Sequence, residues 1–132
     1  MQLSSNKTAQ RTLRFLLIED DKTVVYILQT AFSLLDVPYT ASSVESAEEG
    51  LKLIEQDSWD ILLTDYNLPG MNGLELILHL QMRNIALPTI MLSAYDSFEL
   101  RHRVKQIGVR KYLPKPFDVE EVLDAMRDLL AL

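Results

Sequence analysis

Residues 61–73 read Ile-Leu-Leu-Thr-Asp-Tyr-Asn-Leu-Pro-Gly-Met-Asn-Gly, and this stretch decides the fold. Its apolar run ends on Asp65, and the turn signals Pro69-Gly70 and Asn72-Gly73 follow directly. A short apolar run bounded by turn residues is typical of a strand that is buried on both faces. A carboxylate that closes such a strand stands at its carboxyl end, where open α/β sheets bind their ligands. Asp65 is therefore the first candidate functional residue.

Strand-like and helix-like segments alternate on both sides of this stretch. Apolar runs at 15–18 and 89–92, with weaker runs at 39–41 and 112–113, predict four more strands. Apolar residues at helical spacing predict helices near 22–35, 47–56, 98–107 and 119–130. A further helix is expected near 74–83, but its apolar residues lie nearly all round, so its buried face cannot be predicted. Strict alternation favours an α/β fold: one doubly wound parallel sheet with helices on both faces. Periodicity alone leaves the order of the strands open.

Length and composition bound the class of protein. The chain has 132 residues, which favours a single domain, and a net charge of −6, which argues against nucleic acid as its main partner. It contains no cysteine, which excludes disulfides and thiolate metal sites and fits a reducing compartment such as the cytoplasm. No apolar run approaches the roughly 20 residues of a membrane-spanning helix, so no membrane partner is expected. We expect residues 1–12 to form a flexible extension and 13–132 the folded domain.

Polar side chains collect at the predicted strand ends. They are three acids after the first strand, one acid after the third, a hydroxyl after the fourth and an ammonium after the fifth: Glu19, Asp20, Asp21, Asp65, Ser93 and Lys115. Any one of these acids is most simply an exposed loop residue, but four at the ends of two buried strands point to a site. Clustered carboxylates repel one another unless a cation lies between them. Their oxygens suit Mg²⁺, whereas zinc prefers imidazole and thiolate.

Four motifs make the chain similar to a known family. They are Leu-Leu-Ile-Glu-Asp-Asp at 16–21, Leu-Leu-Thr-Asp-Tyr-Asn-Leu-Pro-Gly-Met-Asn-Gly at 62–73, Met-Leu-Ser-Ala at 91–94 and Tyr-Leu-Pro-Lys-Pro-Phe at 112–117. In this order and spacing, the chain resembles the receiver domain of bacterial two-component response regulators over residues 13–130. The resemblance implies a flavodoxin-like (βα)5 fold with strand order 2-1-3-4-5.

The resemblance also implies a role for each site residue. Asp65 matches the phosphoacceptor, and Glu19 and Asp20 match the acidic pair that holds Mg²⁺, with Asp20 as the direct ligand. The backbone carbonyl of Asn67 is expected to be a further metal ligand. Asp21 lies outside the pair and is expected only to tune its charge.

Three further positions match residues that bind or read the phosphoryl group in this family. Lys115 matches the family's lysine, whose bond to the following Pro116 is cis. Ser93 matches the switch hydroxyl, and Tyr112 matches the aromatic switch residue. No essential position departs from the family's pattern.

The function implied is a signalling module rather than an enzyme with its own substrate. Asp65 would take a phosphoryl group from a phosphohistidine on a histidine kinase or a histidine phosphotransfer protein. The face made by the fourth helix, fifth strand and last helix would then change and control an unknown output partner or domain. This domain is not expected to bind nucleic acid directly. It is expected to be a monomer or a weak dimer, because Arg110, Lys111 and Ala125 replace the charged pairs of one dimerising subfamily.

Two alternatives compete with this interpretation. A Mg²⁺-dependent hydrolase with an aspartyl-phosphate intermediate, similar to the haloacid dehalogenases, would need its nucleophile on the first strand and a second aspartate two residues later. The chain has Asn67 there and no length for a cap domain. A pseudo-receiver that only binds partners would be favoured by loss of Asp65 or Lys115, and both are present. His79 and His102 are more simply surface residues than metal or phosphate sites, and the basic residues at 101–111 more simply form a solvated helix face.

Overall fold

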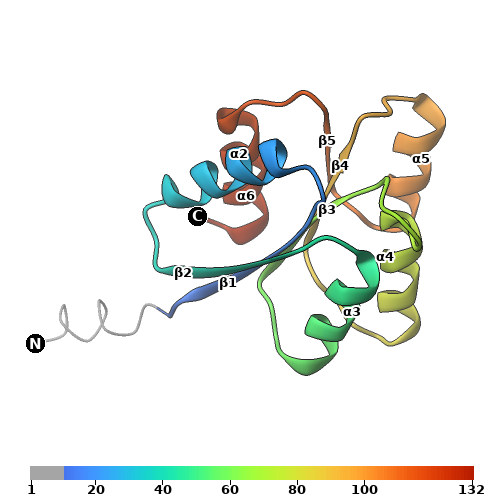
Figure 1. Cartoon of the computed structure of the whole chain (residues 1–132), viewed down its shortest axis with the longest axis horizontal. Coiled ribbons are helices and arrows are strands. Elements are labelled where there is room, and N and C mark those ends of the chain that lie inside the picture. Colours follow the sequence, from blue (N-terminus) through green and yellow to red (C-terminus); the bar gives the residue numbers. More distant parts are fainter. Residues whose placement is uncertain (1–10) are drawn as a thin grey trace, which may run out of the picture.

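The computed structural model describes residues 11–132, so most of the predicted N-terminal extension lies outside the described residues. Strands and helices alternate along the chain (Figure 1). The strands are β1 (Leu13–Ile18), β2 (Tyr39–Val44), β3 (Ile61–Asp65), β4 (Thr89–Ser93) and β5 (Lys111–Pro114). The helices are α2 (Lys22–Ser33), α3 (Ala47–Gln56), α4 (Gly73–Met82), α5 (Phe98–Gln106) and α6 (Val119–Leu130). Within this part of the chain, no helix has both the length and the apolar character needed to cross a membrane.

The strands form one parallel sheet in the order β2-β1-β3-β4-β5, which confirms the predicted fold class and strand order. The central strand β3 and its neighbour β4 are buried along their whole length, as their continuous apolar runs predict. The edge strand β2 reaches Val44, three residues beyond the predicted end. Its extra residues, Ser42 and Ser43, are polar and carry no apolar signal, but backbone pairing with β1 extends the strand.

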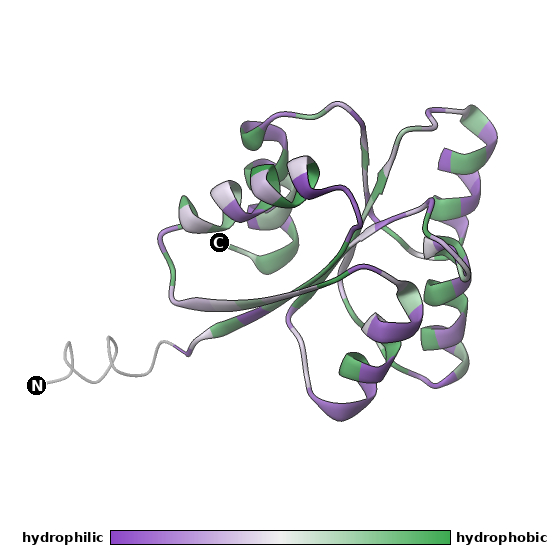
Figure 2. Ribbon diagram, viewed as in Figure 1, coloured by the Kyte–Doolittle hydropathy of each residue, from purple (hydrophilic) through white to green (hydrophobic). Residues whose placement is uncertain are grey.

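Each face of the sheet has its own hydrophobic core (Figure 2). Phe15, Leu17, Leu63 and their neighbours on one face pack against α2 and α6. Leu16, Ile18, Leu62 and their neighbours on the other face pack against α3, α4 and α5. Alternate residues of a strand point to opposite faces, so the apolar runs supply both cores at once. The helices packed on both faces hold the strands in place, and this fixes where the carboxyl ends of the strands lie.

The helices begin at side-chain caps close to the sheet edge. Asp118 and Asn72 form complete capping boxes at the starts of α6 and α4. Residues 46–49, Ser-Ala-Glu-Glu, have the sequence of a capping box, and Ser46 caps α3, since its hydroxyl accepts the N–H of Glu49 at 3.2 Å. The reciprocal half of the box does not form: the carboxylate of Glu49 accepts the Ser46 hydroxyl at 3.0 Å, and not the backbone N–H of Ser46.

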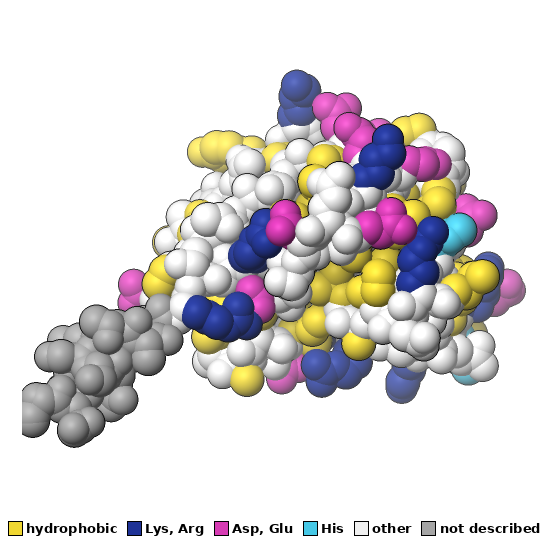
Figure 3. Space-filling view, turned by 90° about the horizontal axis from the view of Figure 1, so that it is seen from below, with side chains coloured by type: hydrophobic (Ala, Val, Ile, Leu, Met, Phe, Trp, Pro, Cys, Tyr) yellow, Lys and Arg dark blue, Asp and Glu magenta, His cyan; other side chains and the backbone are white. Residues whose placement is uncertain are grey.

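A groove lies at the opposite edge of the sheet from the predicted site. It has a volume of about 750 Å³ and lies between the ends of α4 and α5 and the start of β4, with Leu80, Ile85, Pro88 and Ile107 in its wall. On the side of the molecule shown in Figure 3, exposed hydrophobic side chains are interspersed with charged ones of both signs. The groove contains none of the predicted site residues.

Candidate functional site

Three carboxylates converge at the carboxyl edge of the sheet. Asp65 is the last residue of β3, and Glu19 and Asp20 follow β1, its neighbour in the sheet. Each offers an oxygen, and the three oxygens lie within 4.8 Å of one another. Glu19 and Asp65 are only 1% and 5% exposed, whereas Asp20 is exposed. The parallel register of β1 and β3 therefore brings together acids that are more than 40 positions apart in the sequence.

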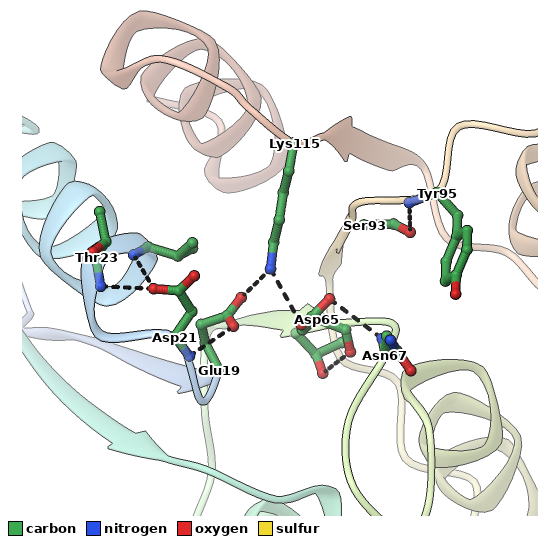
Figure 4. A network of polar contacts seen from close by, with 10 residues as sticks. Glu19, Asp21, Thr23, Asp65, Asn67, Ser93, Tyr95 and Lys115 are labelled. Atoms are coloured by element: carbon green, nitrogen blue, oxygen red, sulfur yellow. Dashed lines mark hydrogen bonds and ion pairs between the residues drawn. The ribbon is translucent and has the colours of Figure 1, made fainter.

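Lys115 supplies the positive charge of the site (Figure 4). Its Nζ lies 2.9 Å from Glu19 Oε1 and 3.2 Å from Asp65 Oδ2. The lysine directly follows β5, and its backbone N–H donates to Ser93 O at 2.7 Å, which continues the sheet pairing by one residue. Its bond to Pro116 is cis, as the resemblance implies. The ammonium thus reaches across β4 to two buried carboxylates.

Burial and charge shift the pKa values of this group in a consistent way. Burial raises the pKa of Glu19 most strongly, and Lys115 and the Asp21 N–H, which Glu19 Oε2 accepts at 3.1 Å, only partly oppose this. Burial alone would lower the pKa of Lys115, but its contacts with Glu19 and Asp65 raise the pKa above its ordinary value. Lys115 therefore stays protonated, while burial disfavours the charged form of its partner Glu19.

This donor set fits a small hard cation. All of its ligand atoms are carboxylate oxygens, which Mg²⁺ prefers, and one lysine cannot neutralise three negative charges. Glu19 Oε1 is buried and makes an ion pair with Lys115 but no well-oriented hydrogen bond, so it retains capacity to accept. The exposed side of Asp20 leaves room for the water molecules that Mg²⁺ keeps in its coordination shell.

The loop between β3 and α4 carries Asn67 beside the Asp65 carboxylate. The backbone N–H of Asn67 donates to Asp65 Oδ1 at 3.3 Å, and the N–H of Gly73 donates to Tyr66 O at 2.8 Å, which closes the loop. A Cβ at Gly73 would lie 2.6 Å from Asp65 O, so glycine is required there. The chain consequently folds back tightly around Asp65.

Ser93 and Tyr112 lie on the neighbouring strands β4 and β5. Ser93 is fully buried, and its Oγ accepts the N–H of Tyr95 at 2.9 Å, which leaves the hydroxyl proton free to donate elsewhere. The Tyr112 hydroxyl donates to Tyr95 O, and the Arg101 guanidinium lies 4.8 Å from the centre of the Tyr112 ring. Tyr95 thereby links the predicted switch hydroxyl to the predicted switch aromatic.

The sequence did not predict the roles of two acidic side chains at this edge, Asp21 and Glu48. Asp21 caps α2, since its Oδ1 accepts the N–H of Thr23 at 2.9 Å, and it is absent from the carboxylate cluster. An aspartate just before an amphipathic helix is the ordinary signal of such a cap. Glu48 of α3 accepts the N–H of Met71 at 3.0 Å, a contact over 23 positions that no local pattern indicates. His79 and His102 lie outside the site, as expected; His79 is half-buried and His102 is exposed against Phe98.

Comparisons with known proteins agree with this geometry. The family described as "Response regulator receiver domain" matches residues 15–127. Response regulator MprA of Mycobacterium bovis (strain BCG / Pasteur 1173P2) is 36% identical over 122 residues, which are 90% of this chain and 51% of the relative. The DNA-binding transcriptional regulator NtrC of Escherichia coli (strain K12) is 32% identical over 106 residues, which are 80% of this chain and 22% of the relative.

Solved structures give the same result. The receiver domain of the Francisella response regulator 1452 aligns with a TM-score of 0.82 and 28% identity, covering 91% of this chain and 98% of that chain. The chemotaxis response regulator CheY4 of Vibrio cholerae aligns with a TM-score of 0.80 at 23% identity, which shows the shared fold. The chain spans about half of one curated relative named above and about a fifth of the other, so the comparison concerns this domain alone. The chain belongs to the response regulator receiver domain family.

Proposed function

We propose that Asp65 accepts a phosphoryl group from a phosphohistidine on a histidine kinase or histidine phosphotransfer protein. One observation carries the proposal: a nearly buried carboxylate at a strand end, with an ammonium 3.2 Å away and two further acids beside it. An ordinary structural ion pair would not need the two extra acids. The domain is thus a signalling module that is modified itself, and its only catalysis is its own phosphorylation and slow dephosphorylation.

The transfer is a displacement at phosphorus. A carboxylate oxygen of Asp65 forms a bond to phosphorus while the P–N bond of the donor breaks, and the histidine leaves with the electron pair and takes up a proton. Lys115 lies beside Asp65 Oδ2 and would neutralise charge on the phosphoryl oxygens. The Ser93 hydroxyl proton would donate to another of these oxygens. Positioning and charge neutralisation supply the rate enhancement in such reactions.

The chain's own residues would also hold a divalent cation. We propose that Glu19, Asp20, Asp65 and the backbone carbonyl of Asn67 hold Mg²⁺, with Asp20 as a direct ligand. When bound, the ion neutralises negative charge on the phosphoryl group during transfer. The ion would also offset the negative charge that Lys115 alone leaves unneutralised among the three acids.

Phosphorylation of Asp65 would change the face formed by α5, β5 and α6. Movement of Ser93 toward the phosphoryl group would break or reorient its contact with Tyr95, and Tyr95 holds the Tyr112 hydroxyl. Phosphorylation would then shift the population of Tyr112 between its half-buried position and a more buried one. An output domain or partner protein would recognise the changed face; direct contact of this domain with nucleic acid is not part of the proposal.

We further propose a monomer or weak dimer, located in the cytoplasm. Lys111 is already paired with Asp128 of its own chain at 2.6 Å. Ala125 is buried and carries no charge. Neither residue therefore offers an unpaired charge to a second copy. The cysteine-free sequence supports a reducing compartment. Sedimentation velocity with and without beryllofluoride tests the first point, and a compact symmetric dimer centred on Arg110 and Lys111 would contradict it.

Labelling with acetyl phosphate and Mg²⁺, followed by intact-mass measurement, tests the proposed acceptor. The wild-type protein should gain one phosphoryl group, and Asp65→Asn should gain none. Asp60→Asn is the matched control, because Asp60 directly precedes β3, at the opposite end of the strand from Asp65, and should not affect labelling. Full Mg²⁺-dependent labelling of Asp65→Asn would refute the assignment. Sustained turnover of a phosphate monoester, rather than stoichiometric labelling, would favour the hydrolase alternative.

A further inference from the structure

The loop at residues 66–72 connects the acceptor Asp65 to α4 and carries Asn67. Both ends of this loop are fixed by the sheet and by α4. The N–H of Tyr66 donates to Leu92 O at 2.7 Å, and Asn72 forms the capping box with Glu75. Between these ends, residues 68–71 contain Pro69-Gly70, a turn whose glycine has a φ of +76°. This middle part directly follows Asn67, whose backbone N–H donates to Asp65 Oδ1 at 3.3 Å.

Glu48 anchors the middle of the loop from a different element. It lies in the first turn of α3, and its Oε2 accepts the N–H of Met71 at 3.0 Å. Within residues 11–132, this is the one hydrogen bond that joins residues 68–71 to another part of the chain. Leu68, which is 6% exposed, adds an apolar anchor in the core beneath. Residues 68–71 are therefore held by the side chains of Leu68 and Met71, which pack on the core, and by one carboxylate from α3.

The fit between this carboxylate and the turn is close. A Cβ built on Gly70 would lie 2.8 Å from Glu48 Oε2, and the positive φ of Gly70 is itself unfavourable for other residues. The Met71 N–H, followed by the backbone N–H of Glu48 itself, lowers the pKa of Glu48 below its ordinary value. The acceptor is thus ionised at neutral pH, and hydrogen bonds to ionised acceptors are stronger than neutral ones.

We propose that Glu48 is a positioning residue for phosphoryl transfer: by holding the Met71 amide, it fixes the loop that places the Asn67 carbonyl beside Asp65. The proposal rests on the proposed function of Asp65. Glu48 is not a member of the carboxylate cluster, so it acts through the loop and not on the phosphoryl group. Residues that orient metal ligands from outside the coordination shell commonly affect metal affinity about 10- to 100-fold.

Three substitutions separate the hydrogen bond from the charge. Glu48→Ala removes both, Glu48→Gln keeps an oxygen that accepts the Met71 N–H, and Glu45→Ala removes an equal charge from a nearby exposed residue. Two measurements are made on each protein. The first is hydrogen exchange of the Met71 amide in metal-free buffer. The second is the Mg²⁺ concentration that gives half the maximal rate of labelling by acetyl phosphate.

Glu48→Ala should speed exchange of the Met71 amide and raise the half-maximal Mg²⁺ concentration about tenfold, the lower end of the range for such orienting residues. Glu48→Gln should restore most of both values, and Glu45→Ala should match the wild type. Equal Mg²⁺ dependence of Glu48→Ala and Glu45→Ala would overturn the proposal, as would a Glu48→Gln protein as impaired as Glu48→Ala. A wild-type protein that is never labelled, with Met71 exchange still dependent on Glu48, would overturn the acceptor function and leave Glu48 a purely structural clamp.

Discussion

Lys115 Nζ lies 3.2 Å from Asp65 Oδ2, although 50 positions separate the two residues in the chain. The contact spans the width of β4, since Asp65 ends β3 and Lys115 follows β5. The same ammonium lies 2.9 Å from the buried Glu19 Oε1. One lysine therefore offsets the charge of two carboxylates that the fold has removed from water, and its loss has consequences for both stability and chemistry.

Substitution of Lys115 by Met should destabilise the fold and abolish labelling of Asp65. Removing one partner of a fully buried ion pair costs about 3–5 kcal/mol, and we expect about 2 kcal/mol here because the Lys115 side chain is partly exposed. Burial already raises the pKa of Glu19, so the folded variant binds a proton there more readily than the unfolded chain does. Its stability should therefore fall as the pH rises through the Glu19 pKa.

Urea unfolding of Lys115→Met at acidic and alkaline pH, in metal-free buffer, measures this effect. Lys105→Met is the control, since Lys105 is an exposed residue of α5. A loss for Lys115→Met that is no larger than for Lys105→Met would contradict the offsetting role of Lys115.

Substitution of Asp20 by Asn should weaken Mg²⁺ binding and slightly stabilise the metal-free fold. It removes one of three negative charges whose oxygens lie within 4.8 Å of one another. Because Asp20 is exposed, we expect a gain of no more than about 1 kcal/mol, the scale of exposed charge interactions. Saturating Mg²⁺ should reverse the order, because an ion that binds only the folded state stabilises the wild type more.

Asp21→Asn is the matched control for that measurement, since it removes the same charge next to Asp20 and asparagine still caps α2. The measurement is the urea midpoint of unfolding of the wild type and both variants, with EDTA and with Mg²⁺. If Mg²⁺ stabilises Asp20→Asn as strongly as the wild type, Asp20 is not a ligand.

Asp60 should contribute stability that disappears in acid. Burial alone would raise its pKa, but the Arg11 guanidinium and the Arg14 N–H, 2.7 Å from Asp60 Oδ2, lower the pKa below its ordinary value. A lowered folded-state pKa gives stability that is complete above the unfolded pKa, near 3.9, and is lost as the pH falls through the folded value. Asp60→Asn should therefore be less stable than the wild type by about 1 kcal/mol at neutral pH.

The difference between wild type and Asp60→Asn should shrink toward zero as the pH falls below 4, about the ordinary aspartate pKa. Urea unfolding of both proteins across this range provides the measurement. Asp57→Asn serves as the control, since Asp57 is exposed and makes only a 3.4 Å surface pair with Arg14. A difference that stays constant across the acid range would rule out the ionised carboxylate as its cause.

Beryllofluoride with Mg²⁺ should shift the amide resonances of Tyr95, Arg101 and Tyr112 as well as those around Asp65. The reason is the chain of contacts from the Ser93 hydroxyl through Tyr95 to the Tyr112 hydroxyl. Ser93→Ala should bind beryllofluoride at Asp65 but lose the distant shifts. Arg101→Ala should enlarge them, because it removes the guanidinium that covers the Tyr112 ring. Shifts confined to the residues around Asp65 in the wild type would leave an acceptor without a switch.

The sequence by itself determined the fold class and the location of the chemistry. Buried strands need continuous apolar runs, and helices need apolar residues at their own period, so the alternation of strand and helix at 15–18, 22–35 and 61–65 follows from local sequence. Carboxylates at strand ends share one edge in any parallel sheet, which predicts the meeting of Glu19 and Asp65.

The tertiary structure alone decided which contacts each side chain makes at that edge. Asp20 and Asp21 are chemically equal neighbours, but the direction of the chain after β1 turns one toward the carboxylate cluster and the other into the cap of α2. The bond between Glu48 and Met71 depends on how α3 packs beside the loop, and the cover of Arg101 over Tyr112 depends on how α5 lies against β5. Such contacts join elements that are distant in sequence. They depend on the helix positions, which are set by the cores on both faces of the sheet.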